Sequence, residues 1–290
     1  MNATLTAVSG VSVGHWTHES GTTGATVVLF DPAAAAGLAQ PGSAPGSREL
    51  GALDPGHLAG AIHGVCLAGG SAFGLAAADG VMAYLEERGV GFDADVARVP
   101  IVPALILFDL RVAKARPDHA AGRAAAAAAS RAPVPQGPVG AGAGARVAKV
   151  NGLSLPGGIG SFALPVGGHQ VGALVALNAF GAVRDPDNGA WLAGGPDWAP
   201  ELGGDWRGNT TLVVVATDAP LGRPQCGVLA KMAQAGLARA IVPAFAPFDG
   251  DSVIAASTGQ GPPVDALTLA RLGDAAAHCV GRAIVQALGR

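Results

Sequence analysis

The chain has 290 residues, of which 50% are hydrophobic, 13% charged and 4% aromatic, and it contains 45 glycines and 21 prolines. A mean hydropathy of +0.39 and a net charge of −3 exclude a disordered chain. Its 18 basic and 21 acidic residues give no basic excess for binding nucleic acid. We therefore expect one globular domain, or two closely fused ones, with a core of small side chains.

Cysteines and apolar segments indicate the compartment. The chain has three cysteines, Cys66, Cys226 and Cys279, and no Cys-x-x-Cys motif. This argues against a set of disulfides and against a zinc knuckle. A secretory signal carries a basic residue ahead of its apolar segment, and the N-terminus up to Val13 has none. Apolar stretches such as Val171–Val183 are too short to span a bilayer. We expect a cytoplasmic protein whose partners include neither membranes nor nucleic acids.

The first half of the chain alternates strand and helix patterns. Val8–Val13 and Ala25–Phe30 are predicted strands joined by a polar turn from His15 to Gly24, and a loop is expected over Asp31–Leu50. The elements predicted after them are an apolar segment at Ala59–Ala68, a helix over Leu75–Arg88 with Ser71 as its N-cap, a proline-broken strand over Val99–Leu107 and a helix over Pro117–Arg131.

The second half opens with a glycine-rich stretch, Gly137–Gly160, in which Arg146–Val150 is a short predicted strand. Gln170–Asn178 and Leu212–Ala216 have apolar residues on both faces of the predicted strand, which is typical of fully buried strands. Between them lies the longest predicted loop, the polar insert Arg184–Gly208. The remaining predicted elements are a helix over Pro224–Ala240, a strand over Ser252–Ser257 and a helix over Val264–Leu288.

Four short motifs resemble known sites without meeting their requirements. Gly69–Gly74 lacks the second glycine of a nucleophile elbow, and Gly140–Ala145 lacks the strand–turn–helix context of a dinucleotide site. His15 and His18 have no third metal ligand nearby, and Asp185–Gly189 lacks the terminal glutamate of a calcium loop. We interpret these residues as structural, so that no metal or cofactor is expected.

The strongest chemical feature is a hydroxyl residue where the polar insert enters a buried strand. Asn209 and Thr210 directly precede Thr211 and the apolar run that begins at Leu212. A threonine hydroxyl is a weak nucleophile, but its own α-amino group can serve as the base once the preceding peptide bond is cut. Cleavage would begin with Thr210 attacking the carbonyl of Asn209, followed by hydrolysis of the resulting ester. On spacing alone, the favoured interpretation is a strand that starts with β-favouring threonines, and self-cleavage is the alternative.

Five segments, in this order and spacing, resemble the L-aminopeptidase/D-esterase family of self-processing hydrolases, which includes the β-peptidyl aminopeptidases. They are Val13–Thr17 with Thr26–Leu29, Gly69–Gly74 with Ala78–Val81, Gly157–Ser161, Asn209–Leu221 and Asp249–Asp251. The resemblance implies an α/β fold, a four-layer αββα sandwich like that of N-terminal-nucleophile hydrolases but with different strand connectivity. It also implies a single domain over residues 1–290, cleaved into chains 1–209 and 210–290 that stay together, and a homo-oligomer of four or more copies.

The same resemblance implies roles for particular residues. Thr210 would be the nucleophile, and the cut would fall between Asn209 and Thr210. Because Thr211 is also a hydroxyl residue, a shift of one residue stays open, although cleavage after asparagine favours Thr210.

Five further residues match family positions. Asn178 would help to form the oxyanion hole, and Asp251 would orient the amino group and hydroxyl of the nucleophile. Asp249 stands where better-known members carry serine, and at that position it would be a polar partner of Thr210. Repulsion between two carboxylates at this spacing can raise the pKa of one of them. Gly157 and Gly158 would be substrate-binding positions.

The implied activity is hydrolysis of short peptides, amino-acid amides or β-peptides from the N-terminus, without metal or cofactor. Some members place a tyrosine before the Gly-Gly-Ile-Gly motif, whereas Ala148 and Lys149 occupy that neighbourhood here. This departure concerns the substrate class. Three alternative functions also stay open: a dedicated amidase of small-molecule or secondary metabolism, an acyltransferase similar to ornithine acetyltransferase, and a non-catalytic scaffold.

Overall fold

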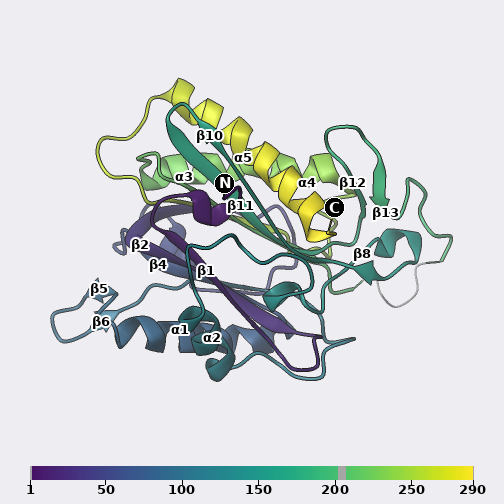
Figure 1. The fold of residues 1–290 in the computed structure, drawn as a ribbon, viewed down its shortest axis with the longest axis horizontal. Coiled ribbons are helices and arrows are strands. Elements are labelled where there is room, and N and C mark those ends of the chain that lie inside the picture. Colours follow the sequence, from purple (N-terminus) through teal and green to yellow (C-terminus); the bar gives the residue numbers. More distant parts are fainter. Residues whose placement is uncertain (1, 202–206, 290) are drawn as a thin grey trace.

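The structure is a computed structural model that describes residues 2–201 and 207–289. Residues 202–206 of the predicted insert Arg184–Gly208 lie outside the described residues, as do positions 1 and 290 of the predicted domain. Two stacked β-sheets form the centre of the molecule, and helices cover the outer face of each sheet (Figure 1).

The long strand β2 (Gly24–Ala39) joins the two sheets. Its last part pairs with β16, in the sheet that we call sheet I, and its first part pairs with β1 and β4, in sheet II. Sheet I contains β10 (Gly158–Val166), β11 (His169–Asn178), β14 (Thr210–Thr217) and β16 (Ser252–Ser257) in that order. Sheet II contains β1 (Val11–Thr17), β4 (Ile62–Ala68), β7 (Ala104–Ile106) and β3 (Ser47–Arg48).

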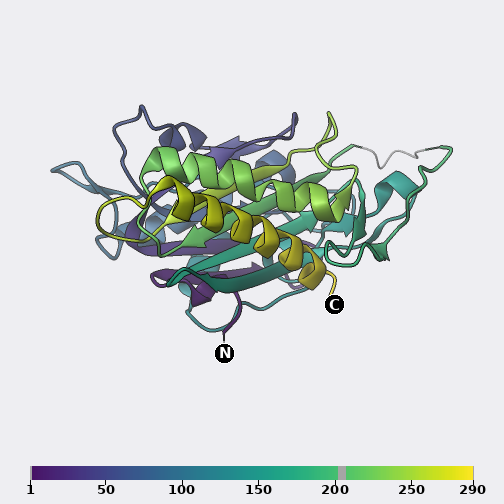
Figure 2. The same cartoon turned by 90° about the horizontal axis from the view of Figure 1, so that it is seen from above.

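Helices α3 (Arg223–Ala233), α4 (Ala235–Ala240) and α5 (Ala266–Ala287) cover sheet I. Figure 2 shows α3 and α5 lying across this sheet. Helices α1 (Ala77–Glu86) and α2 (His119–Ala127) cover sheet II. Separate apolar clusters fill the space between sheet I and its helices, between the two sheets, and between sheet II and its helices. Three buried interfaces make four layers, so the predicted αββα sandwich is confirmed.

Side chains of the central strands alternate between two of these clusters. In β11, Leu174 and Ala176 face the other sheet, whereas Val175 and Leu177 face the helices. This is the two-residue period of a strand, and burial on both faces explains the uninterrupted apolar sequence. Strand β14 alternates in the same way.

Glycines let the helices pack directly on the strands. A Cβ added at Gly14 of β1 would lie 2.1 Å from the carbonyl oxygen of Ala125 in α2, and one added at Gly160 of β10 would lie 1.8 Å from that of Ala283 in α5. Both distances are far below any contact that a real Cβ makes, so only glycine fits there. The glycine-rich composition therefore reflects contact between helix backbone and strand backbone.

Short strands complete the fold. They are β5 (Phe92–Asp93), β6 (Arg98–Val99), β8 (Arg146–Val147), β9 (Leu155–Pro156), β12 (Ala182–Arg184), β13 (Trp191–Ala193) and β15 (Ile241–Val242). Among the helices described, none is both long and apolar enough to cross a membrane.

Several sequence expectations were wrong in detail. The loop expected over Asp31–Leu50 is strand as far as Ala39, because β2 passes through a register shift between Leu29 and Ala34 and continues into sheet I. The helix expected over Pro224–Ala240 is two helices, α3 and α4. Strand β10 was missed because its glycines, which α5 requires, disguise the strand pattern.

Ser71, His15 and part of the polar insert also have a local structure that differs from the expectation. Ser71 does not cap a helix: it has a φ of 55° and begins a 3-10 turn that leads into α1, without a capping hydrogen bond. His15 is not in a turn, because β1 extends to Thr17, and its ring hydrogen-bonds the hydroxyl of Thr26 on the neighbouring strand. Part of the expected insert is also strand, β13.

Candidate active site

The candidate site lies where β11 ends and where β14 and β16 begin. Asn178, the last residue of β11, is the register partner of Thr210, the first residue of β14. The turn that leads into β16 runs beside them, because Asn209 and Asp249 form a parallel bridge. Sheet pairing thus brings Thr210, Asn178, Asp249 and Asp251 together from three separate segments.

Two groups act on the carbonyl oxygen of Asn209. The Thr210 hydroxyl donates a hydrogen bond to it, and the Gly250 N–H donates to the same oxygen at 2.9 Å. A Cβ at position 250 would lie 2.7 Å from the Thr210 Oγ1, so glycine leaves room for the hydroxyl. A backbone N–H in this position can stabilise the charge that develops on a carbonyl oxygen under nucleophilic attack.

The segment before this peptide bond has a left-handed backbone at Gly208, where φ is +87°. A Cβ there would lie 2.3 Å from the ring of Phe108. Both the conformation and the packing therefore require glycine. Gly208 directs the chain from the insert into the buried start of β14.

Lys149 is a buried cation that the sequence interpretation did not assign to the site. Its Nζ donates to Asn209 Oδ1 at 2.8 Å and to the backbone oxygen and Oδ1 of Asn178 at 3.2 Å each. A buried ammonium is costly unless it is hydrogen-bonded, and these contacts hold it against both asparagines. The sequence contains one indication of this role: Arg146 and Lys149 are the only charged residues between Gly137 and Gly160.

The side chain of Asn178 has a defined orientation. Its Oδ1 accepts from the backbone N–H of Arg146 at 2.9 Å, and its Nδ2 donates to the backbone oxygens of Phe108 and Gly208, at 3.3 Å each. The amide therefore donates both to Gly208, two residues before Thr210, and to Phe108 in a separate segment of the chain.

Asp251 anchors the start of β14 to the turn before β16. Its Oδ1 accepts from the backbone N–H of Thr211 at 2.6 Å, and its Oδ2 accepts from that of Phe245 at 3.2 Å. Burial raises the pKa of Asp251 to about 6, although these N–H groups and Lys149 act in the opposite direction.

Asp249 lies in the same turn. Its Oδ2 accepts from the backbone N–H of Ala246 at 2.9 Å, and its Oδ1 is buried without a hydrogen-bond partner among the described residues. Burial and the neighbouring charge of Asp251 raise the pKa of Asp249 to about 7. Both carboxyl groups therefore titrate closer to neutral pH than a free carboxyl does, which suits proton transfer.

Gly157 and Gly158 lie at the start of β10 and are buried. A Cβ at Gly157 would lie 2.0 Å from the carbonyl oxygen of Leu177, and one at Gly158 would lie 2.6 Å from that of Ala287. Neither belongs to the described lining of the cavity beside Asn178. Their substrate-binding role remains a prediction.

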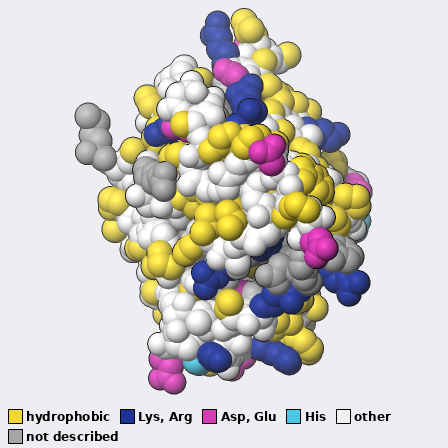
Figure 3. Space-filling view, turned by 90° about the vertical axis from the view of Figure 1, so that its right-hand side faces the viewer, with side chains coloured by type: hydrophobic (Ala, Val, Ile, Leu, Met, Phe, Trp, Pro, Cys, Tyr) yellow, Lys and Arg dark blue, Asp and Glu magenta, His cyan; other side chains and the backbone are white. Residues whose placement is uncertain are grey.

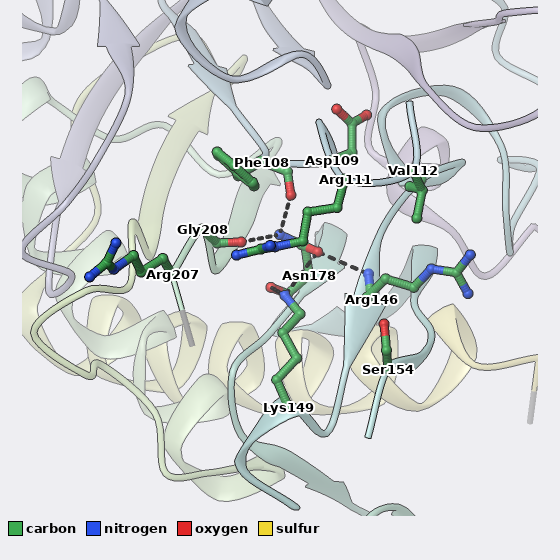
Figure 4. A pocket seen from close by; sticks show the side chains of 11 residues that line it. Phe108, Asp109, Arg111, Val112, Arg146, Lys149, Ser154, Asn178, Arg207 and Gly208 are labelled. Carbon is green, nitrogen blue, oxygen red and sulfur yellow. Dashed lines mark hydrogen bonds between the residues drawn. The ribbon is translucent and has the colours of Figure 1, made fainter. Parts of the chain in front are cut away.

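A cavity of about 450 Å³ opens beside the site, a size that suits a small ligand. Figure 3 looks onto the side where β8 and β13 lie and shows several Lys and Arg side chains on the lower half of that face. The described lining consists of Phe108, Asp109, Arg111, Val112, Gly144, Arg146, Lys149, Ser154, Asn178, Arg207 and Gly208 (Figure 4).

The arrangement suits acyl transfer. It combines a hydroxyl nucleophile, an N–H donor on a carbonyl oxygen, an oriented amide and two carboxyl groups that titrate near neutral pH. Within the described part of the chain, no three His, Cys, Asp or Glu side chains are grouped so that they could hold a metal ion.

The sequence profile of peptidase family S58 matches residues 3–290. An uncharacterized aminopeptidase of Mycobacterium tuberculosis is 37% identical over 330 aligned positions, which cover 97% of this chain and 92% of that protein. A 6-aminohexanoate-oligomer endohydrolase of a Kocuria species is 30% identical over 271 positions, covering 87% of this chain and 74% of that enzyme.

Solved structures are similar as well. A β-aminopeptidase of a Burkholderia species superposes with a TM-score of 0.75 at 25% identity, covering 99% of this chain and 86% of that one. The L-aminopeptidase D-Ala-esterase/amidase of Ochrobactrum anthropi superposes with a TM-score of 0.77 at 20% identity, covering 98% and 85% of the two chains. The latter fold is described as a variant of the N-terminal-nucleophile hydrolase fold.

Proposed function

The chain belongs to peptidase family S58, and from that premise we propose that it is a self-processing aminopeptidase whose nucleophile is Thr210. Membership and the aminopeptidase relatives support a hydrolase of this type. One observation carries the finer proposal: the Thr210 hydroxyl and the Gly250 N–H both donate to the carbonyl oxygen of Asn209.

Self-cleavage is the first stage of the proposed mechanism. The Thr210 oxygen attacks the carbonyl carbon of Asn209 and transfers its proton to the carboxylate pair, while the Gly250 N–H stabilises the oxyanion. The bond between that carbon and the Thr210 nitrogen then breaks, and the nitrogen gains a proton. Water hydrolyses the resulting ester, which leaves a carboxylate on Asn209 and a free hydroxyl and amino group on Thr210.

Turnover is the second stage. The new amino group of Thr210 accepts the proton of its own hydroxyl as the oxygen attacks the amide carbon of a substrate. The Asn178 amide donates to the substrate oxyanion, and the amino group returns the proton to the departing amine. Water then hydrolyses the acyl ester of Thr210 and releases the N-terminal residue.

The proposed substrates are short peptides, amino-acid amides or β-peptides. The β-aminopeptidase from Burkholderia supports this class by its name. The 30% identical endohydrolase, named for 6-aminohexanoate oligomers, favours as a second candidate a dedicated amidase of small-molecule or secondary metabolism. Both candidates use the same Thr210 chemistry and differ in the acyl group that they release. We further propose a homo-oligomer, a tetramer or larger.

Two neighbouring substitutions test the nucleophile. Thr210→Ala is expected to leave an uncut chain and to abolish release of 4-nitroaniline from amino-acid and β-amino-acid anilides. Thr211→Ala serves as the matched control and is expected to leave cleavage largely intact, because Thr211 contributes its backbone N–H to Asp251. If the Thr211 variant were the inactive one, the choice of Thr210 would be wrong. If the cleaved wild-type protein released no amine from any anilide, the scaffold alternative would replace hydrolysis.

A further inference from the structure

We infer that the cavity beside Asn178 binds a carboxylate group of the substrate, and that Arg146 is the residue that recognises it. This inference rests on the proposed function, because it specifies which amides the Thr210 site hydrolyses. The carboxylate lies away from the amide that is cut, either on the acyl part or on the leaving amine.

The lining of the cavity is rich in basic side chains. The whole chain has only 18 basic residues, yet Arg111, Arg146, Lys149 and Arg207 all line this one cavity. In a chain so poor in charge, four cations around about 450 Å³ create a local positive potential that attracts an anion.

Asp109 is the one acidic residue among the described lining residues, so the four cations outnumber the carboxyl groups there. Its Oδ1 accepts from the backbone N–H of Gly70 at 2.7 Å, and burial raises its pKa above the ordinary value. In Figure 4 its carboxyl group points away from Asn178 and Gly208, whereas the side chain of Arg111 extends toward them. The interior of the cavity therefore faces basic groups.

Arg146 combines a place beside Asn178 with a buried side-chain N–H that lacks an acceptor among the described residues. Its backbone N–H holds the Oδ1 of Asn178, so its side chain starts directly beside the proposed oxyanion donor. Its Nε is buried and has no hydrogen-bond partner among the described residues. An unsatisfied buried N–H is costly, and a carboxylate oxygen is the acceptor that a guanidinium binds best, because two parallel hydrogen bonds can form.

The other walls define the rest of the ligand. Phe108 and Val112 line the same cavity and offer apolar contact to a short carbon chain. The substrate class that fits is a short amide that carries a free carboxylate a few carbon atoms from the bond that is cut.

Two matched substrate pairs test the inference and separate the two places where the carboxylate can lie. Alanine 3-carboxy-4-nitroanilide and alanine 4-nitroanilide differ by a carboxylate on the leaving amine. Glutamic acid 4-nitroanilide and glutamine 4-nitroanilide differ by a carboxylate on the acyl part. We expect the carboxylate member of at least one pair to have a kcat/KM about tenfold higher in the wild-type enzyme, the effect of one charge-assisted hydrogen bond.

Variants assign the preference to one residue. Arg146→Gln is expected to bring the ratio of the two kcat/KM values close to one, and Arg146→Lys to retain part of the preference. The backbone bond to Asn178 survives both substitutions, and self-cleavage reports that each variant has folded. Arg98→Gln, on the short strand β6, is the control and is expected to leave the ratio unchanged.

Three results would overturn the inference. The first is that neither pair shows a preference in the wild type. The second is that the uncharged member of each pair is preferred, and the third is that Arg146→Gln leaves the preference intact. All three require that the uncharged anilides are hydrolysed, so the proposed function would stand. A chain that neither cleaves itself nor hydrolyses any of the four substrates would instead overturn the proposed function, and the carboxylate site with it.

Discussion

The carbonyl group of Asn209 is contacted from two directions, by the hydroxyl of Thr210 and by the N–H of Gly250. Lys149 holds the side chain of the same asparagine at 2.8 Å. Each contact comes from a different part of the chain, so the peptide bond is oriented before any chemistry begins. This orientation is the contribution that a folded chain can make to its own cleavage.

The carboxyl groups of Asp249 and Asp251 make a pH-dependent contribution to stability. Their pKa values, about 7 and about 6, lie above the ordinary value of 3.8, so the folded chain binds more protons than the unfolded chain between about pH 4 and pH 7. The free energy of unfolding contributed by these groups therefore falls as the pH rises through this window.

Urea unfolding of two uncut chains measures this effect. Thr210→Ala is expected to keep the chain intact, and a second chain adds Asp249→Asn, whose amide oxygen can still accept from the Ala246 N–H. We expect Asp249→Asn to become more stabilising between pH 5 and pH 8, by about 1 to 2 kcal/mol, because one pKa unit corresponds to about 1.4 kcal/mol. A stability difference that does not change with pH would show that Asp249 ionises normally.

At the scale of helices and strands, α3 packs on β2 through a pair of glycines. A Cβ at Gly37 of β2 would lie 2.2 Å from the backbone nitrogen of Gly227 in α3, whereas a Cβ at Gly227 would have no atom within 4 Å. The two glycines lie close together, but only a side chain at position 37 would collide with the neighbouring backbone. A side chain at position 227 would point into open space.

This asymmetry gives a matched pair of substitutions. Gly37→Ala is expected to lower the free energy of unfolding by about 1 to 3 kcal/mol, the usual cost of overpacking. Gly227→Ala is expected to raise it by up to about 1 kcal/mol, because alanine favours the helix. Denaturant titration of both variants is the measurement, and equal effects at the two positions would contradict the packing described here.

The elements that sequence patterns predicted best are the buried strands. Gln170–Asn178 and Leu212–Ala216 were expected and correspond to β11 and β14, because burial on both faces leaves an unmistakable apolar run. Strand β10 escaped prediction because Gly158 and Gly160 serve the approach of α5, a partner more than 100 residues later in the chain. Local sequence does not reveal such a partner.

The site was predictable to a similar degree. Thr210, Asn178, Asp249 and Asp251 were named from the sequence, and strand pairing brings them together. Lys149 was not, because its contacts lie on Asn178 and Asn209, which only the fold brings near it. Their catalytic roles remain predictions.

At the scale of the whole molecule, the proposed cut falls at the start of β14, a strand that is buried along its whole length. Strand β14 lies between β11 and β16, and β16 pairs with β2. The two strands that follow residue 209, β14 and β16, therefore lie between β11 and β2, which both precede it, and α5 packs on β10 and β11. Breaking one peptide bond removes none of these contacts.

We expect chains 1–209 and 210–290 to elute as one species in gel filtration under native conditions, and to separate only in denaturant. Light scattering on the same column gives the number of copies in the proposed homo-oligomer. Elution of either fragment alone without denaturant would contradict the interleaved strand order.

The central claim is that the chain cuts itself between Asn209 and Thr210. Intact mass spectrometry of the purified wild-type protein in denaturant, with N-terminal sequencing of the smaller fragment, tests it most directly. The predicted result is two fragments whose masses sum to that of the 28.3 kDa chain plus one water, with the sequence Thr-Thr-Leu-Val at the new N-terminus. A single uncut chain, or a fragment that begins at Thr211, would contradict it.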